Sequence, residues 1–156
     1  MFSELLPLLT TKAVSLKVRG ELYKTCVRPV MLYGSETWPV KAEDTQRLHR
    51  NEMSMIQWMC GAKLKDNKSC VELRLLLGID SITSEMQTRR LRWFGHIERR
   101  DESDWLKRVQ HLEVNGSRGR GRPQKTWSQV IEDDIRSKNI PRKLGLHRGR
   151  WRSRIK

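Results

Sequence analysis

The chain has 156 residues, of which 37% are hydrophobic and 32% are charged, and its formal net charge is +14. This length suits one domain, or a small domain with extensions, and the polar composition leaves room for only a small core. The positive charge indicates a polyanionic partner. No apolar run approaches the roughly 18 residues that a membrane-spanning helix needs. Three scattered cysteines exclude a disulfide framework.

The start of the chain is briefly apolar, but Glu4 and Pro7 interrupt it and no basic segment precedes it. Such a segment makes a poor secretory signal. Few, scattered cysteines are typical of a reducing compartment. We therefore expect an intracellular protein, nuclear or cytoplasmic, that is neither secreted nor held in a membrane.

Apolar residues at helical spacing predict a first helix over residues 11–33. Pro29 should kink or end this helix, because proline cannot continue the backbone hydrogen bonds. A second helix is predicted over residues 43–60, with acidic residues at its start and Gly61 as its C-terminal stop.

Ser69 and Gly78 have the residue types that begin and end a short helix, so a helix is predicted over residues 70–77. Ser81 can then cap a long helix that includes residues 89–100. After a turn over residues 101–104, the spacing of apolar residues predicts one more short helix as far as Leu112.

Residues 116–126 contain no apolar side chain and predict a flexible basic linker. Thr126 can cap a last helix, whose apolar residues recur at helical spacing from Trp127 to Ile135. Beyond Asn139 the chain is strongly basic, and we expect a loosely ordered tail.

No stretch alternates in the manner of a β-strand, so the predicted fold is mostly α. We expect a small array of about five or six helices with a basic, partly disordered C-terminal tail. The predicted segments are residues 1–61, residues 62–115 and residues 116–156, the last comprising the linker, the short helix and the tail. Six tryptophans, spread roughly one per element, are best interpreted as anchors of a thin shared core.

The segment RRLRWFGHIERR, residues 89–100, combines a broad apolar stripe with a fan of arginines. Its amphipathic pattern favours a core helix with a solvated charged face. The alternative is a helix that buries one side and offers Arg89, Arg90, Arg92, Arg99 and Arg100 to a polyanion. Gly95 within this helix costs about 1 kcal/mol relative to alanine, which a close helix contact or a local bend would explain.

Most of the excess charge lies at the end of the chain, since residues 116–156 carry 13 Lys and Arg against 3 Asp and Glu. The run Arg120-Gly121-Arg122-Pro123 resembles the core of an AT-hook, which reads a narrow minor groove. General phosphate contact is the favoured interpretation, with minor-groove contact and a solvated linker as alternatives. The candidate nucleic-acid contacts here are Arg118, Arg120, Arg122, Lys125, Arg148, Arg150, Arg152 and Arg154. Trp151, amid these arginines, is the candidate for base stacking.

No pattern of catalytic or metal-binding residues is present. Cys60, Cys70 and the histidines have no zinc-ligand spacing, and the cysteines are interpreted as buried side chains. Glu132, Asp133 and Asp134 are neighbours on a helix, so their carboxylates do not converge on a metal pair. We expect no catalytic residue, no metal and no cofactor.

Three segments in this order resemble the C-terminal region of LINE-type, non-LTR retrotransposon reverse transcriptases. They are VRPVMLYGSETWPV (residues 27–40), RRLRWFGHIERR (residues 89–100) and GRGRPQKTWSQVIEDDI (residues 119–135). The resemblance extends from about residue 8 to residue 140. It implies a helical thumb and post-thumb region that helps to hold template RNA and target DNA, with the arginines of residues 89–100 on a helix that faces nucleic acid or is structural.

The sequence departs from that family in two respects. The Tyr/Phe-x-Asp-Asp motif of the polymerase does not occur, and neither does the zinc knuckle of some members. We therefore expect a non-catalytic fragment that binds RNA or DNA mainly through phosphates. The alternatives are a protein-interaction module that uses exposed apolar surface, and a relic reading frame without a selected function.

Overall fold

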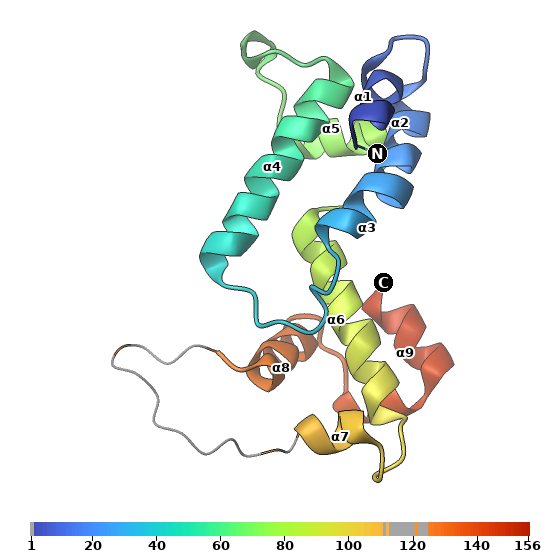
Figure 1. Cartoon of the computed structure of the whole chain (residues 1–156), viewed down its shortest axis with the longest axis vertical. Coiled ribbons are helices and arrows are strands. Elements are labelled where there is room, and N and C mark those ends of the chain that lie inside the picture. Colours follow the sequence, from blue (N-terminus) through green and yellow to red (C-terminus); the bar gives the residue numbers. More distant parts are fainter. Residues whose placement is uncertain (1, 111, 113–120, 122–124) are drawn as a thin grey trace. The chain divides into compact units, whose positions relative to one another are not determined.

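The computed structural model describes residues 2–110, 112, 121 and 125–156 (Figure 1). In chain order the α-helices of these residues are α1 (Phe2–Thr10), α2 (Leu16–Leu22), α3 (Arg28–Met31), α4 (Ala42–Cys60), α5 (Cys70–Leu77), α6 (Ile82–Glu98), α7 (Trp105–Gln110), α8 (Trp127–Ser137) and α9 (Arg148–Ile155). A π-helical turn (Tyr23–Val27) joins α2 to α3, and 3-10 turns cover Leu64–Asp66 and Arg142–Leu146. No strand occurs in the described residues, and the prediction of a mostly α fold is confirmed.

The chain forms two compact units that interleave in sequence. Unit 1 comprises Met1–Tyr33 and Val40–Glu85, and unit 2 comprises Gly34–Pro39 and Met86–Lys156. This division differs from the three predicted segments, because α5 shares a hydrophobic core with α2 and α4, while residues 127–155 share another with α6. Local sequence patterns do not reveal which helices share a core.

Unit 1 is held by an apolar cluster from α1, the Tyr23–Val27 turn, α4 and α5. Its buried members are Leu9, Tyr23, Val27, Met53, Ile56, Met59, Leu73, Leu77 and Ile79. The backbones of α2 and α5 approach so closely that a Cβ on Gly20 would lie 1.9 Å from the carbonyl oxygen of Leu77. Any larger residue at position 20 would therefore force these two helices apart.

A fully buried carboxylate, Glu52 on α4, ties unit 1 together. Arg28 donates to Glu52 Oε1 at 2.5 Å, and the hydroxyl of Tyr23 donates to the same atom at 3.2 Å. Oε2 accepts the backbone N–H of Ile82 at 3.1 Å and lies 3.4 Å from Arg74 Nη2. Burial, and next the nearby Glu52 charge, raise the pKa of Tyr23, so this hydroxyl stays protonated as a donor.

Unit 2 is built around α6, with α8 and α9 packed against it. Its buried core comprises Leu91, Phe94, Ile131, Ile140, Trp151 and Ile155. Arg90 on α6 forms a two-point ion pair with Asp134 on α8, at 2.8 and 3.2 Å. The indole N–H of Trp151 on α9 donates to the carbonyl of Leu91 at 2.8 Å.

The predicted helix ends are confirmed where their capping residues were recognised. Ser69 accepts the backbone N–H of Glu72, and Thr126 accepts that of Gln129, each within a capping box. Gly61 and Gly78 end α4 and α5 in the left-handed conformation, with φ of 62° and 63°.

Both ends of the chain are more regular than the sequence indicated. Residues 2–10 form α1 despite Pro7, although no helix was predicted there. The expected loose tail beyond Asn139 is instead ordered, because Trp151 and Ile155 lie one turn apart on α9 and fill the core of unit 2.

The cysteines and the membrane prediction can be compared directly with the structure. Cys60 is half-buried, and burial raises the pKa of its thiol, whereas Cys70 is exposed, which corrects the expectation of a buried side chain. Of the helices that the structure describes, none has the length and apolarity needed to cross a bilayer.

Candidate nucleic-acid interface

One face of α6 carries cationic and aromatic side chains in register. Residues 89, 92, 93, 96 and 99 recur at intervals of one, three and four positions, which places them on one side of the helix. The other side of α6 carries Leu91 and Phe94 into the core of unit 2. The packing of that core therefore fixes which way the polar stripe faces.

One close contact between α9 and α6 involves Trp151 and Gly95. Trp151 is 1% exposed, and a Cβ on Gly95 would lie 2.4 Å from its indole nitrogen. Gly95 is thus explained by close helix packing, one of the two explanations that the sequence left open. Trp151 was the candidate for base stacking. The structure corrects this prediction, because the Trp151 ring is buried and its indole N–H donates to the Leu91 carbonyl.

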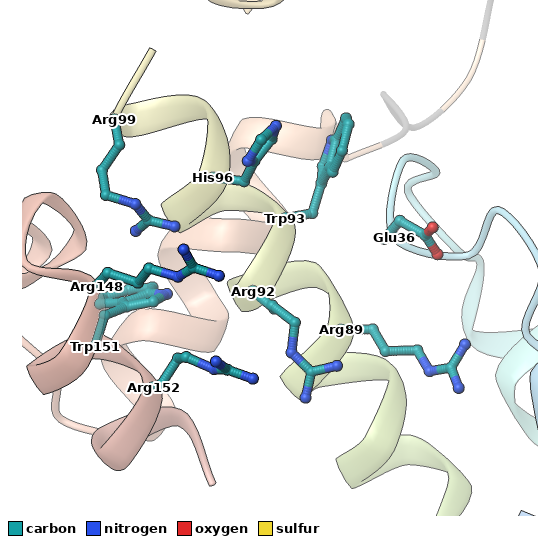
Figure 2. A pocket seen from close by; sticks show the side chains of 9 residues that line it. All are labelled: Glu36, Arg89, Arg92, Trp93, His96, Arg99, Arg148, Trp151 and Arg152. Atoms are coloured by element: carbon teal, nitrogen blue, oxygen red, sulfur yellow. The ribbon is translucent and has the colours of Figure 1, made fainter. Parts of the chain in front are cut away.

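The two helices and Glu36, from the segment Gly34–Pro39, line an open hollow of about 680 Å³ within unit 2, which we call the arginine hollow (Figure 2). Its lining residues are Glu36, Arg89, Arg92, Trp93, His96, Arg99, Arg148, Trp151 and Arg152. The backbone of Glu36 is held in place, since its carbonyl accepts the indole N–H of Trp127 at 2.8 Å. Five arginines and one carboxylate line this hollow, so its field is strongly positive.

The positive charges of the hollow are close enough to affect one another. The pKa of Arg99 is lowered, first by burial and then by the neighbouring charge of Arg148. Arg99 is held by a 2.7 Å hydrogen bond from Nη1 to the carbonyl of Gly145. Arg92, Arg148 and Arg152 form no ion pair with any residue in the described part of the chain. An anion in the hollow would relieve this repulsion.

An aromatic pair lies at the same site. The rings of Trp93 and His96 stack with centroids 5.3 Å apart and an interplanar angle of 27° (Figure 2). Arg100 donates to Nε2 of His96 through Nε at 3.3 Å, so that nitrogen acts as an acceptor. The indole N–H of Trp93 has no hydrogen-bond partner among the described residues, unlike those of Trp127 and Trp151.

The remaining predicted contact residues lie elsewhere. Arg90 is corrected to a structural role, because it is 9% exposed and paired with Asp134. Arg100 pairs with Asp104 at 3.4 Å, and Lys125 pairs with Asp133 at 2.7 Å. Arg150 and Arg154 are exposed on α9 but do not line the hollow, and Arg118, Arg120 and Arg122 lie outside the described residues.

Sequence analysis assigned no binding role to Glu36, Trp93 or His96. The signal for the last two was present, because positions 89, 92, 93, 96 and 99 share a helical face. Glu36 could not be found in this way, since it comes from a segment more than fifty residues before Arg89.

The carboxylate cluster on α8 is occupied by ion pairs. Asp134 pairs with Arg90, and Asp133 pairs with Lys125, whose hydrogen bond lowers the pKa of the Asp133 carboxyl. Within the ranges that the structure describes, no three His, Cys, Asp or Glu side chains converge as metal ligands.

Comparison with known proteins gives one informative match. No protein-family model matches the chain, and no solved structure matches it. The chain is 23% identical over 128 residues to an uncharacterised transposon-derived protein of Caenorhabditis elegans. The match covers 79% of this chain and 46% of that relative, so the chain spans about half of the relative's length. The comparison thus suggests an origin in a transposable element.

Proposed function

We propose that unit 2 binds nucleic acid, RNA or DNA, mainly through phosphates that contact the arginine hollow. The observation that supports this is the convergence of five arginines from α6, its C-terminal end and α9 around one hollow that contains a single carboxylate. Guanidinium groups bind phosphate oxygens through planar, paired hydrogen bonds. Such contacts carry little sequence information, so binding to many sequences is expected.

The origin that we propose is the thumb and post-thumb region of a LINE-type, non-LTR retrotransposon reverse transcriptase. The three sequence segments and the transposon-derived relative support it. For this stretch of chain we propose a non-catalytic role, because the Tyr/Phe-x-Asp-Asp motif does not occur in it. A relic without selected function is the alternative under the same origin.

The proposed function is tested by fluorescence anisotropy of the full chain with labelled RNA and DNA at several salt concentrations. The logarithm of the binding constant should fall linearly with the logarithm of salt, by about 0.7 to 0.9 per phosphate contacted. Replacing Arg148 and Arg152 together with glutamine should reduce that slope by about 1.4 to 1.8.

The matched control replaces Arg150 and Arg154 with glutamine, which removes the same charge from the same helix outside the hollow. Equal losses in the two double variants would show that α9 attracts polyanions without using the hollow. Binding that does not change with salt would contradict the proposed function itself. An A·T preference through Arg120 and Arg122 stays a prediction, which the same titrations test.

A second candidate function is docking on a protein. On α7 and just beyond it, Trp105, Val109 and Leu112 are 72%, 59% and 66% exposed. Exposed apolar patches of this kind mark interaction surfaces. Light scattering of the full chain should then show self-association that Val109→Glu abolishes, whereas a monomer that binds no hydrophobic dye would count against this function.

A further inference from the structure

The arginine hollow has two chemically different parts. Arg148 and Arg152 come from one face of α9, about 6 Å apart along the helix axis, because four residues rise about 1.5 Å each. Trp93 and His96 come from α6 and present stacked rings (Figure 2). Phosphate contact alone needs only the arginines and not the aromatic rings.

The indole N–H groups distinguish Trp93 from the two tryptophans, Trp127 and Trp151, that pack in the core of unit 2. Trp127 and Trp151 donate their indole N–H groups to carbonyls at 2.8 Å. Trp93 is partly exposed, lines the hollow and has an indole N–H without a partner among the described residues. One face of its ring stacks on His96, so a ligand would use the other face together with the indole N–H.

Bases stack on a protein aromatic ring only where they are not paired and stacked within a duplex. A duplex presents its phosphates to the arginines but keeps the faces of its bases covered. An unpaired strand presents both groups, and neighbouring guanidiniums and rings bind them together in proteins that hold single strands. The composition of the hollow thus fits an unpaired strand better than a duplex.

We propose that the arginine hollow takes an unpaired nucleic-acid strand, with one base stacked on Trp93 and the adjoining phosphates on Arg148 and Arg152. This inference rests on the proposed function of nucleic-acid binding and adds the form of the nucleic acid. The stacking contact accepts any base, because every base has a π-face.

The experiment compares four ligands of equal length on the full chain: a single strand of RNA, a single strand of DNA, a DNA duplex, and an abasic strand that keeps only sugar and phosphate. The chain should bind either single strand about 5- to 150-fold more tightly than the abasic strand, the range for loss of one stacked base. Comparing the affinities for the two single strands shows whether the hollow prefers RNA or DNA.

Three variants separate stacking from charge. Trp93→Leu should remove the preference for bases over the abasic strand, and Trp93→Phe should retain most of that preference. Trp105→Leu is the matched control, since Trp105 is 72% exposed and lies outside the hollow. Arg148→Gln with Arg152→Gln should weaken binding to all four ligands.

The outcomes distinguish this inference from the function on which it rests. If the full chain binds single strand, abasic strand and duplex equally, and Trp93→Leu changes none of them, the unpaired-strand inference is wrong and phosphate binding stands. If the full chain binds none of the ligands, both are overturned. Circular dichroism confirms that each variant keeps its helices.

Discussion

At the scale of single residues, Gly95 shows how packing outweighs helix propensity. Alanine at this position would gain about 1 kcal/mol of helix propensity. Its Cβ, however, would lie 2.4 Å from the indole nitrogen of Trp151, in the core of unit 2. The contact between α6 and α9 therefore requires a residue without a side chain.

We expect Gly95→Ala to destabilise the protein by about 1 to 3 kcal/mol, the usual cost of overpacking, and to displace α9 from the hollow. Urea unfolding followed by tryptophan fluorescence measures this change. Gly149→Ala on α9 is the matched control, because nothing lies within 4 Å of its added Cβ, and it should stabilise by up to about 1 kcal/mol. A stabilised Gly95→Ala variant would refute the close contact.

Tyr23 makes stability depend on pH at the alkaline end. Burial, with the Glu52 charge second, raises its folded-state pKa above the ordinary value of 10.0. The stabilisation from the retained proton is complete below pH 10 and is lost as the pH rises towards the folded-state pKa, because only the unfolded state then releases the proton.

We expect the free energy of unfolding to fall above pH 10 by at most about 1.4 kcal/mol per pH unit from this group. Tyr23→Phe should remove that part of the slope, although it weakens the protein at neutral pH by withdrawing a hydrogen bond from Glu52. Tyr33→Phe, at a side chain that is 86% exposed, should leave the slope unchanged. Urea titrations between pH 8 and 11 measure all three proteins, and equal slopes would contradict the argument.

At the scale of elements, α8 is fixed to α6 by the Arg90–Asp134 pair. Both side chains are about one-tenth exposed, and each satisfies the other's charge. Removing one partner leaves an uncompensated buried charge, whereas replacing both with apolar residues of similar volume is often neutral.

We therefore expect Asp134→Ala to cost about 3 kcal/mol or more, and Arg90→Met with Asp134→Leu to cost much less than that single change. Thermal or urea unfolding measures the free energy of unfolding of the single and the double variants. If the double variant is less stable than either single variant, the pair has a net stabilising role beyond charge compensation. Nucleic-acid affinity should be unchanged in the double variant, since Arg90 does not line the hollow.

The elements also show what the sequence can and cannot predict. Ser69, Gly78 and Thr126 act within one turn of the chain, so their helix ends were predictable from local chemistry. The partner of Arg90 lies 44 residues away, so no local pattern could identify it. Likewise, the burial of Trp151 depends on its distant contact with Leu91 and Gly95, which local spacing does not reveal.

At the scale of the whole molecule, each compact unit has its own hydrophobic core. Ile56 is buried in the core of unit 1, and Leu91 in that of unit 2. Truncating either side chain to alanine should cost about 2 to 5 kcal/mol. The loss of stability should mainly affect the unit to which the truncated residue belongs.

Hydrogen exchange followed by mass spectrometry tests this expectation. Ile56→Ala should lower amide protection mainly in α2, α4 and α5, and Leu91→Ala mainly in the second half of α6, α8 and α9. The two variants serve as controls for each other. A uniform loss of protection across both units in each variant would show that the chain unfolds as one cooperative body.

The distance along the chain between Leu91 and Trp151 has a consequence for synthesis. Their hydrogen bond spans 60 residues, and Trp151 and Ile155 belong to the core of unit 2. The ribosome must therefore translate codon 155 before α6 gains its complete cover, whatever has folded earlier. A frameshift or stop codon between the codons of Phe94 and Trp151 yields a chain in which Leu91 and Phe94 lack the cover that Trp151 provides. Exposed apolar surface of that kind is recognised by cellular proteases, so a chain that lacks Trp151 and Ile155 is expected to accumulate poorly.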